Sequence, residues 1–250
     1  MNAKISTSLG RSARLLGQSA KRIEARISGT TLDPANYERL IGFGTACDWL
    51  NWAKDLKALS YTNKRRNRSE RAYAMNEITR FTFIWTAANA LFARSEILKI
   101  LDPAFSDHAS ELERFRLLFN HSGMSPADVI SAQEILHTLL SQPMHVQQFP
   151  WTSFNNPPTV MEIIYFKYTT PRERSRGIGR RLSTAARTGS CANLDLPTLI
   201  YANRNWNIHG VLLSSFFRGT RKKFNLWIDT INLSLANIIE GSANVLQSHL

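Results

Sequence analysis

The sequence is poor in cysteine, with only Cys47 and Cys191 among its 250 residues. The two lie far apart and have no histidine at the spacing of a metal site, so neither a disulfide framework nor a zinc site is predicted. The lack of a predicted disulfide framework indicates that the protein works in a reducing compartment, so we expect a cytoplasmic protein. Because no clear cluster of carboxylates and histidines is present, we expect no metal and no other cofactor.

Long hydrophobic runs are also lacking. The longest apolar stretches, such as residues 81–93, are too short and too closely flanked by charge to cross a bilayer. With 43% hydrophobic residues, the chain can still bury one substantial core or two small ones. We therefore expect a soluble globular protein without a membrane partner.

Acidic residues are scarce relative to basic ones. The chain has 19 Asp and Glu against 31 Lys and Arg, a net charge of +12 at pH 7. Such an excess indicates a polyanionic partner, such as a nucleic acid or an acidic membrane surface. The basic residues gather between 11 and 26, between 64 and 71, and in the segments 171–187 and 218–223. The last two segments flank the motif described below.

Apolar residues recur at helical spacing through most of the chain, which predicts an all-α bundle. We expect one helix at 34–60, with a break around Gly42 and Gly44, and another at 71–101. A short helix should follow a cap at Ser106 or Asp107, and a further helix should begin at Pro126. The last two helices are expected at 196–217 and 221–249. Residues from about 169 to 192 are mostly Arg, Ser, Thr and Gly, which predicts an Arg-rich loop. A helical domain over 34–250 would then follow a basic N-terminal arm or helix at 1–33, which we prefer to a targeting peptide because the whole chain is basic.

The segment YANRNWNIHGVLL, residues 201–213, places polar residues inside a predicted helix. Asn205 and His209 are four residues apart and share a face, whereas Arg204 is rotated from His209 by roughly 140° on an ideal helix. Two arrangements would bring Arg204 and His209 together. The long arginine stem wraps around the helix, or two copies of the helix meet across a dyad. An ordinary amphipathic surface remains the alternative.

Within this segment, RNWNIHG resembles the R-x4-6-H signature of the HEPN superfamily, with Arg204, Asn205 and His209 at the matching positions. A second stretch, FIWTAANALF at 83–92, is similar to the early aromatic helix of HEPN proteins, which has the form W-x-A-x-N-A-L-F. The matching residues there are Trp85, Asn89, Leu91 and Phe92. The two stretches cover a small part of the chain.

The resemblance implies a HEPN-type all-α bundle, a homodimer, and metal-independent endoribonuclease activity in a toxin or an antiviral defence effector. His209 would act as general acid and base, Arg204 would hold the phosphate, and Asn205 would fix the imidazole or bind substrate. An antitoxin or regulatory protein is a possible further partner. We expect RNA to be gathered by the flanking basic residues, namely Arg174, Arg176, Arg180, Arg181, Arg218, Arg221 and Lys222.

Two other functions stay open. Some HEPN proteins keep the fold and only bind nucleotides or partners, so the chain could be a basic helical module that binds RNA or protein without catalytic turnover. It could also be a scaffold that docks a second protein through its N-terminal helix.

Overall fold

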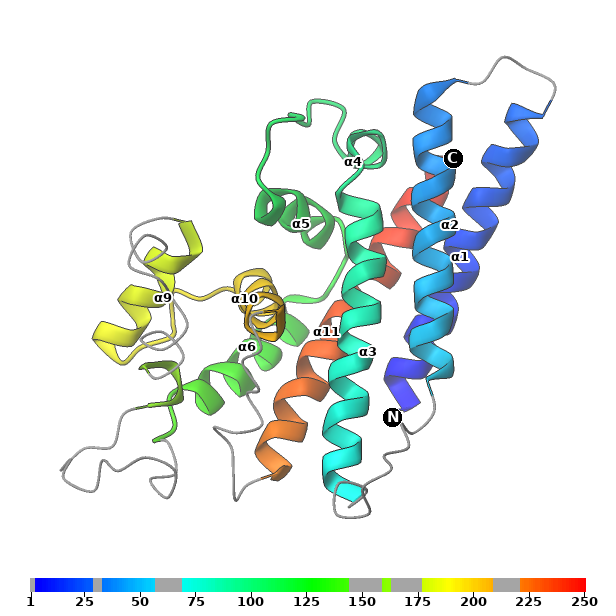
Figure 1. Ribbon diagram of the computed structural model, residues 1–250. Coiled ribbons are helices and arrows are strands. Elements are labelled where there is room, and N and C mark those ends of the chain that lie inside the picture. Colours follow the sequence, from blue (N-terminus) through cyan, green and yellow to red (C-terminus); the bar gives the residue numbers. More distant parts are fainter. Residues whose placement is uncertain (1–2, 29–32, 57–68, 144–158, 163–176, 209–220) are drawn as a thin grey trace. The chain divides into compact units, whose positions relative to one another are not determined.

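The computed structural model describes residues 3–28, 33–56, 69–143, 159–162, 177–208 and 221–250. These residues are almost entirely helical and form no β-strand, which confirms the all-α fold class (Figure 1). Within these ranges no helix has both the length and the apolar character needed to cross a membrane.

The chain divides into two compact units. The first comprises Met1–Pro126 and Ile231–Leu250, and the second comprises Ala127–Thr230. The last helix, α11 (Arg221–Ser248), contributes residues to both units. This division does not follow the boundary at residue 33 that the sequence suggests.

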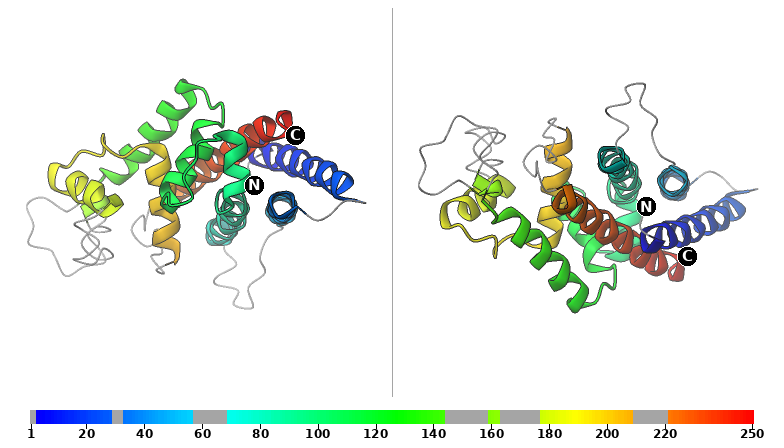
Figure 2. Two further views of the ribbon diagram at one scale, coloured as in Figure 1. Left: turned by 90° about the horizontal axis from the view of Figure 1, so that it is seen from above. Right: turned by 90° about the horizontal axis from the view of Figure 1, so that it is seen from below.

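In the first unit, helix α1 (Ala3–Ile27) packs along α2 (Pro34–Asp55). Its apolar residues Ile5, Leu9, Leu16 and Ile23 are almost completely buried. Both views in Figure 2 also place α1 beside the C-terminal end of α11. Polar contacts join these two helices: Arg11 pairs with Glu240 at 2.7 Å, and Gln247 Nε2 donates to Gln18 Oε1 at 2.8 Å. Residues 3–27 are therefore an integral helix of this unit.

Helix α2 is continuous, so the predicted break around Gly42 and Gly44 is wrong. Asp33 caps its start by accepting a hydrogen bond from the Ala35 N–H at 3.1 Å, and Pro34 occupies the first turn. The lack of a side chain at Gly42 allows Ile97 and Arg94 to pack closely against α2. A Cβ added there would overlap Ile97 Cδ1 and lie 2.8 Å from Arg94 Cδ.

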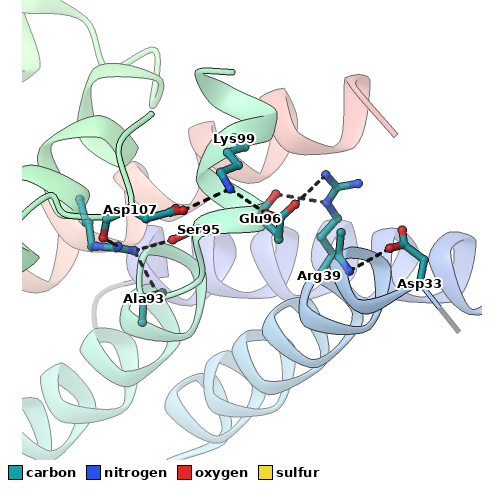
Figure 3. A network of polar contacts seen from close by, with 9 residues as sticks. Asp33, Arg39, Ala93, Ser95, Glu96, Lys99 and Asp107 are labelled. Carbon is teal, nitrogen blue, oxygen red and sulfur yellow. Dashed lines mark hydrogen bonds and ion pairs between the residues drawn. The ribbon is translucent and has the colours of Figure 1, made fainter. Parts of the chain in front are cut away.

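The single helix predicted at 71–101 is in fact two helices, α3 (Ser69–Phe92) and α4 (Ser95–Leu101). Arg114, on α5 (Glu111–Asn120), accounts for the interruption. Its Nη1 donates to Ala93 O and Ser95 Oγ, both at 3.3 Å, at the junction of α3 and α4 (Figure 3). A guanidinium from elsewhere in the chain thus satisfies carbonyl groups that a continuing helix would have used.

Helix α5 begins after Ser110, so the predicted cap at Ser106 or Asp107 is wrong. Ser110 and Glu113 form a capping box: Ser110 N donates to Glu113 Oε2 at 2.7 Å, and Glu113 N donates to Ser110 Oγ at 3.4 Å. Asp107 belongs to a different group of contacts. Lys99 Nζ lies 3.4 Å from its carboxylate and 3.0 Å from that of Glu96 (Figure 3).

A buried polar network lies inside the first unit. Arg80 Nε is 3.1–3.2 Å from both carboxylate oxygens of Glu77, and these side chains are 2% and 1% exposed. The Arg80 guanidinium also donates to Ala53 O and to Leu56 O at the C-terminal end of α2. Asn232 Nδ2, on α11, reaches Glu77 Oε2 at 3.2 Å. The network therefore connects α2, α3 and α11.

The second unit contains α6 (Pro126–Leu140), α9 (Gly177–Thr188), α10 (Leu196–Ile208) and the first part of α11. Helix α9 lies where the sequence predicts an Arg-rich loop, so that prediction is wrong for residues 177–188. Leu182, Ala185 and Ala186 are buried on one face of α9. Alanine is the strongest helix former, and a face of small residues can pack without many large apolar groups.

Candidate functional site

Helix α10, which carries the Arg204 motif, has a defined beginning. The Asp195 carboxylate accepts a hydrogen bond from the Thr198 N–H at 3.0 Å, which satisfies a backbone donor of the first turn. Asp195 also lies 3.4 Å from Arg181 Nη1, on α9. Both side chains of that ion pair are more than 40% exposed, so it contributes little to stability.

The inner face of α10 is fixed by two tryptophans and one asparagine. Trp206, on α10, lies with its ring centroid 6.2 Å from that of Trp227, on α11. The Trp227 Nε1–H donates to Asn203 Oδ1 at 2.9 Å, and both residues are almost completely buried. A buried indole N–H needs an acceptor, and Asn203 supplies it. Because Asn203 immediately precedes Arg204, this bond fixes the orientation of α10 against α11 next to the motif.

Arg204 and Asn205 are joined directly. Arg204 Nη1 donates to Asn205 Oδ1 at 2.8 Å, and the guanidinium carbon lies 5.8 Å from the centre of the Tyr201 ring. Arg204, Asn205 and Tyr201 are all half-buried. The arginine side chain therefore lies against that of the next residue, Asn205. Neither of the two arrangements that would bring Arg204 to His209 is tested, because His209 lies outside the described residues.

The other predicted site residues fall into two groups. Among those described, Arg180 and Lys222 are exposed, and Arg181 forms the ion pair with Asp195. The following lie outside the residues that the structure describes: His209, Arg174, Arg176 and Arg218, together with the side chain of Arg221. The structure thus brings Arg204 and Asn205 together and leaves the position of His209 untested.

Asn203, Tyr201 and Trp227 were not identified from the sequence. Asn203 and Trp227 are 24 residues apart on different helices, so no local pattern joins them. The sequence offered one indication of this contact: a buried tryptophan N–H usually has a hydrogen-bond acceptor, so a polar partner for Trp227 could have been expected. Tyr201 lies three residues before Arg204, a spacing that places two side chains on the same side of a helix.

In the described part of the chain, no group of three or more His, Cys, Asp and Glu side chains is placed to hold a metal ion. Both described cysteines are unpaired thiols. Burial raises the pKa of Cys191, whose sulfur lies 3.8 Å from Ser141 Oγ, and this favours the neutral thiol over the thiolate.

Comparison of the chain with models of protein families, with curated proteins and with solved structures found no match.

Proposed function

We propose that the chain is a metal-independent endoribonuclease of the HEPN type, with Arg204, Asn205 and His209 at its active site. One observation carries the proposal: the 2.8 Å hydrogen bond from Arg204 to Asn205. Asn205 precedes His209 by four residues, the spacing of two side chains on one face of a helix. The bond therefore directs the guanidinium toward the side of the motif where the sequence places the histidine.

The chemistry of RNA cleavage fits these three residue types. The 2′-oxygen of the ribose attacks the adjacent phosphorus, and the bond from phosphorus to the 5′-oxygen breaks. The products are a 2′,3′-cyclic phosphate and a 5′-hydroxyl. His209 would accept the proton of the 2′-hydroxyl and return a proton to the leaving 5′-oxygen. Arg204 would bind the phosphate and stabilise the charge that develops on it, while Asn205 orients the guanidinium.

Substrate binding would depend on the basic residues around the motif. The exposed Arg180 and Lys222 and the other cations of segments 171–187 and 218–223 would attract the RNA backbone. We also propose a homodimer, in which a second copy completes the site, and a role as a toxin or antiviral defence effector. An intracellular ribonuclease needs restraint, so an antitoxin or regulatory protein is the proposed further partner.

The test is cleavage of a mixed RNA pool in EDTA. We expect the wild-type chain to cut RNA and to leave 2′,3′-cyclic phosphate ends. His209→Ala and Arg204→Ala should abolish cleavage, because each removes a group that acts in the transition state. His108→Ala is the matched control, since His108 is exposed and lies in the other unit. That variant should cut as the wild type does.

A different result would reject the ribonuclease. If the wild type binds RNA without cutting it, and Arg204→Ala loses only a fraction of the affinity, the chain is a basic binding module. If His209→Ala still cuts at the wild-type rate, the activity belongs to other residues or to a contaminant.

A further inference from the structure

A cluster of three aromatic side chains, one exposed and two half-buried, lies in the first unit. Trp52, on α2, is 56% exposed, the largest exposed fraction among the big apolar side chains of the described residues. Its neighbours are Trp49, one turn earlier on α2, and Phe83, on α3. Isolated exposed apolar residues are common, whereas a cluster of three rings points to a binding surface.

The three rings hold one another in place. The Trp52 centroid is 4.7 Å from that of Trp49, with 76° between the ring planes, and 6.4 Å from that of Phe83, with 64° between the planes. Trp49 and Phe83 are 5.3 Å apart. Edge-to-face pairs of this kind stabilise a fixed orientation. The contacts with Trp49 and Phe83 therefore restrict the motion of the Trp52 ring, so a ligand that stacks on this ring loses little side-chain entropy on binding.

Two carboxylates flank the exposed ring. Asp48 is four residues before Trp52 and Asp55 is three residues after it, so both share its face of α2. Asp48 is exposed, and the Asp55 side chain is 70% exposed. Lys54 lies 3.5 Å from Asp55; the Lys54 side chain is half-buried, but the Asp55 carboxylate is open to solvent, and such a pair is weak. We call Asp48, Trp49, Trp52, Asp55 and Phe83 the Trp52 surface.

The charges decide which partner fits the Trp52 surface. Two carboxylates beside the ring repel phosphates, which argues against a stacking site for RNA bases or for anionic lipid headgroups. They attract cations instead. A guanidinium can lie on the face of a tryptophan and pair with a carboxylate at the same time.

We propose that the Trp52 surface is a docking site for an arginine-rich peptide segment of a partner protein. An arginine side chain stacks on Trp52, and Asp48 and Asp55 pair with that arginine and its neighbours. This proposal does not rest on the proposed ribonuclease activity, because its test measures peptide binding and not RNA cleavage.

The experiment measures binding of fluorescein-labelled nona-arginine to the full chain by anisotropy at low salt. We expect saturable binding, although the net charge of the chain opposes it. Trp52→Ala should weaken binding about tenfold through loss of the stacked ring. Asp48→Asn with Asp55→Asn should weaken it about fivefold and reduce its dependence on salt. Trp52→Phe should retain part of the affinity, because it retains a ring.

Tyr37→Ala with Glu38→Gln is the matched control. These residues are also an exposed aromatic and an exposed acid on α2, but they lie about four turns from Trp52. The control should bind nona-arginine as the wild type does, and the far-UV circular dichroism spectrum of every variant at the assay temperature should match that of the wild type, which shows that each is folded.

Three results would overturn the proposal: no binding of nona-arginine to the wild type, equal loss in the control and the Trp52→Ala variant, or unchanged binding in all variants. Two parallel probes separate other partners. If Trp52→Ala instead loses affinity for labelled oligouridine, the surface binds nucleic acid. If it loses affinity for vesicles of phosphatidylcholine with phosphatidylserine, the surface binds membranes.

Discussion

The indole N–H of Trp227 donates a 2.9 Å hydrogen bond to the side-chain oxygen of Asn203, and both residues are buried between α10 and α11. Asn203 immediately precedes Arg204. The bond therefore links the packing of the second unit to the orientation of the residue that we propose binds phosphate.

The first prediction concerns this bond. Asn203→Leu removes the acceptor and leaves the Trp227 N–H buried without it, which should lower the free energy of unfolding by about 1–3 kcal/mol. Urea unfolding followed by tryptophan fluorescence measures the change. Cleavage should fall as well, although Asn203 does not contact substrate in the proposal.

Asn193→Ala is the control for that variant. Asn193 donates to Arg181 O at 3.2 Å from an exposed position, so its loss should have a small effect. Equal stability of Asn203→Leu and the wild type would show that the bond does not support α10.

The second prediction concerns Arg204 and Asn205. Arg204→Lys keeps the charge and loses the planar donor pair, and we expect the cleavage rate to fall by about 10²–10³. Asn205→Ala should reduce the rate less, because it releases the guanidinium without removing it. The two changes act through one hydrogen bond, so the double variant should be no slower than Arg204→Lys alone. Independent, additive losses would mean that Asn205 does not position Arg204.

Local signals predicted several helix boundaries. Asp33 with Pro34 marks the start of α2, Ser125 with Pro126 marks the start of α6, and the periodic residues after Arg221 mark α11. In each case the residues that determine the boundary are adjacent in sequence. The all-α class follows from the same periodicity.

The boundaries that were wrong depend on residues distant in sequence. Arg114 lies some twenty residues after the junction between α3 and α4 that it bonds to, so the apolar pattern of residues 71–101 could not reveal the interruption. Glycine is a poor helix former, so Gly42 suggested a break. Its packing against Ile97, on α4, and Arg94, the residue before α4, could not be seen in the local sequence. Of the candidate site, the sequence supplied Arg204 and Asn205, whereas the Asn203–Trp227 bond required the pairing of α10 with α11.

The third prediction concerns the buried ion pair of Arg80 and Glu77. Arg80→Met leaves the Glu77 carboxylate buried without its cation and frees the carbonyls of Ala53 and Leu56. We expect a loss of about 3–5 kcal/mol in the free energy of unfolding. Arg80→Met combined with Glu77→Leu removes both charges and should recover much of that loss. Urea denaturation of the three proteins tests this, and a double variant less stable than Arg80→Met would refute it.

The fourth prediction concerns the capping box of α5. The hydrogen bonds from Ser110 lower the pKa of Glu113 below its ordinary value. A lowered carboxylate pKa stabilises the fold above the unfolded pKa, and the stabilisation is lost as pH falls through the folded value. Ser110→Ala should therefore reduce the thermal midpoint at pH 7, and the difference from wild type should shrink under acid conditions. Ser106→Ala, at a nearby exposed position outside α5, is the control. A difference that stays constant with pH would mean that Glu113 does not contribute through this cap.

The last prediction compares two glycines in helices of the first unit. A Cβ at Gly241, on α11, would overlap the carbonyl oxygen of Ser122, which is backbone and cannot rotate away. Gly241→Ala should therefore force α11 away from that segment and destabilise the unit by about 3 kcal/mol or more. At Gly44, on α2, a Cβ would meet nothing within 4 Å. Gly44→Ala should stabilise the protein by about 0.5–1 kcal/mol, because alanine favours the helix. Thermal melting of the two variants should shift in opposite directions, and a stabilising Gly241→Ala would show that α11 does not pack this closely on Ser122.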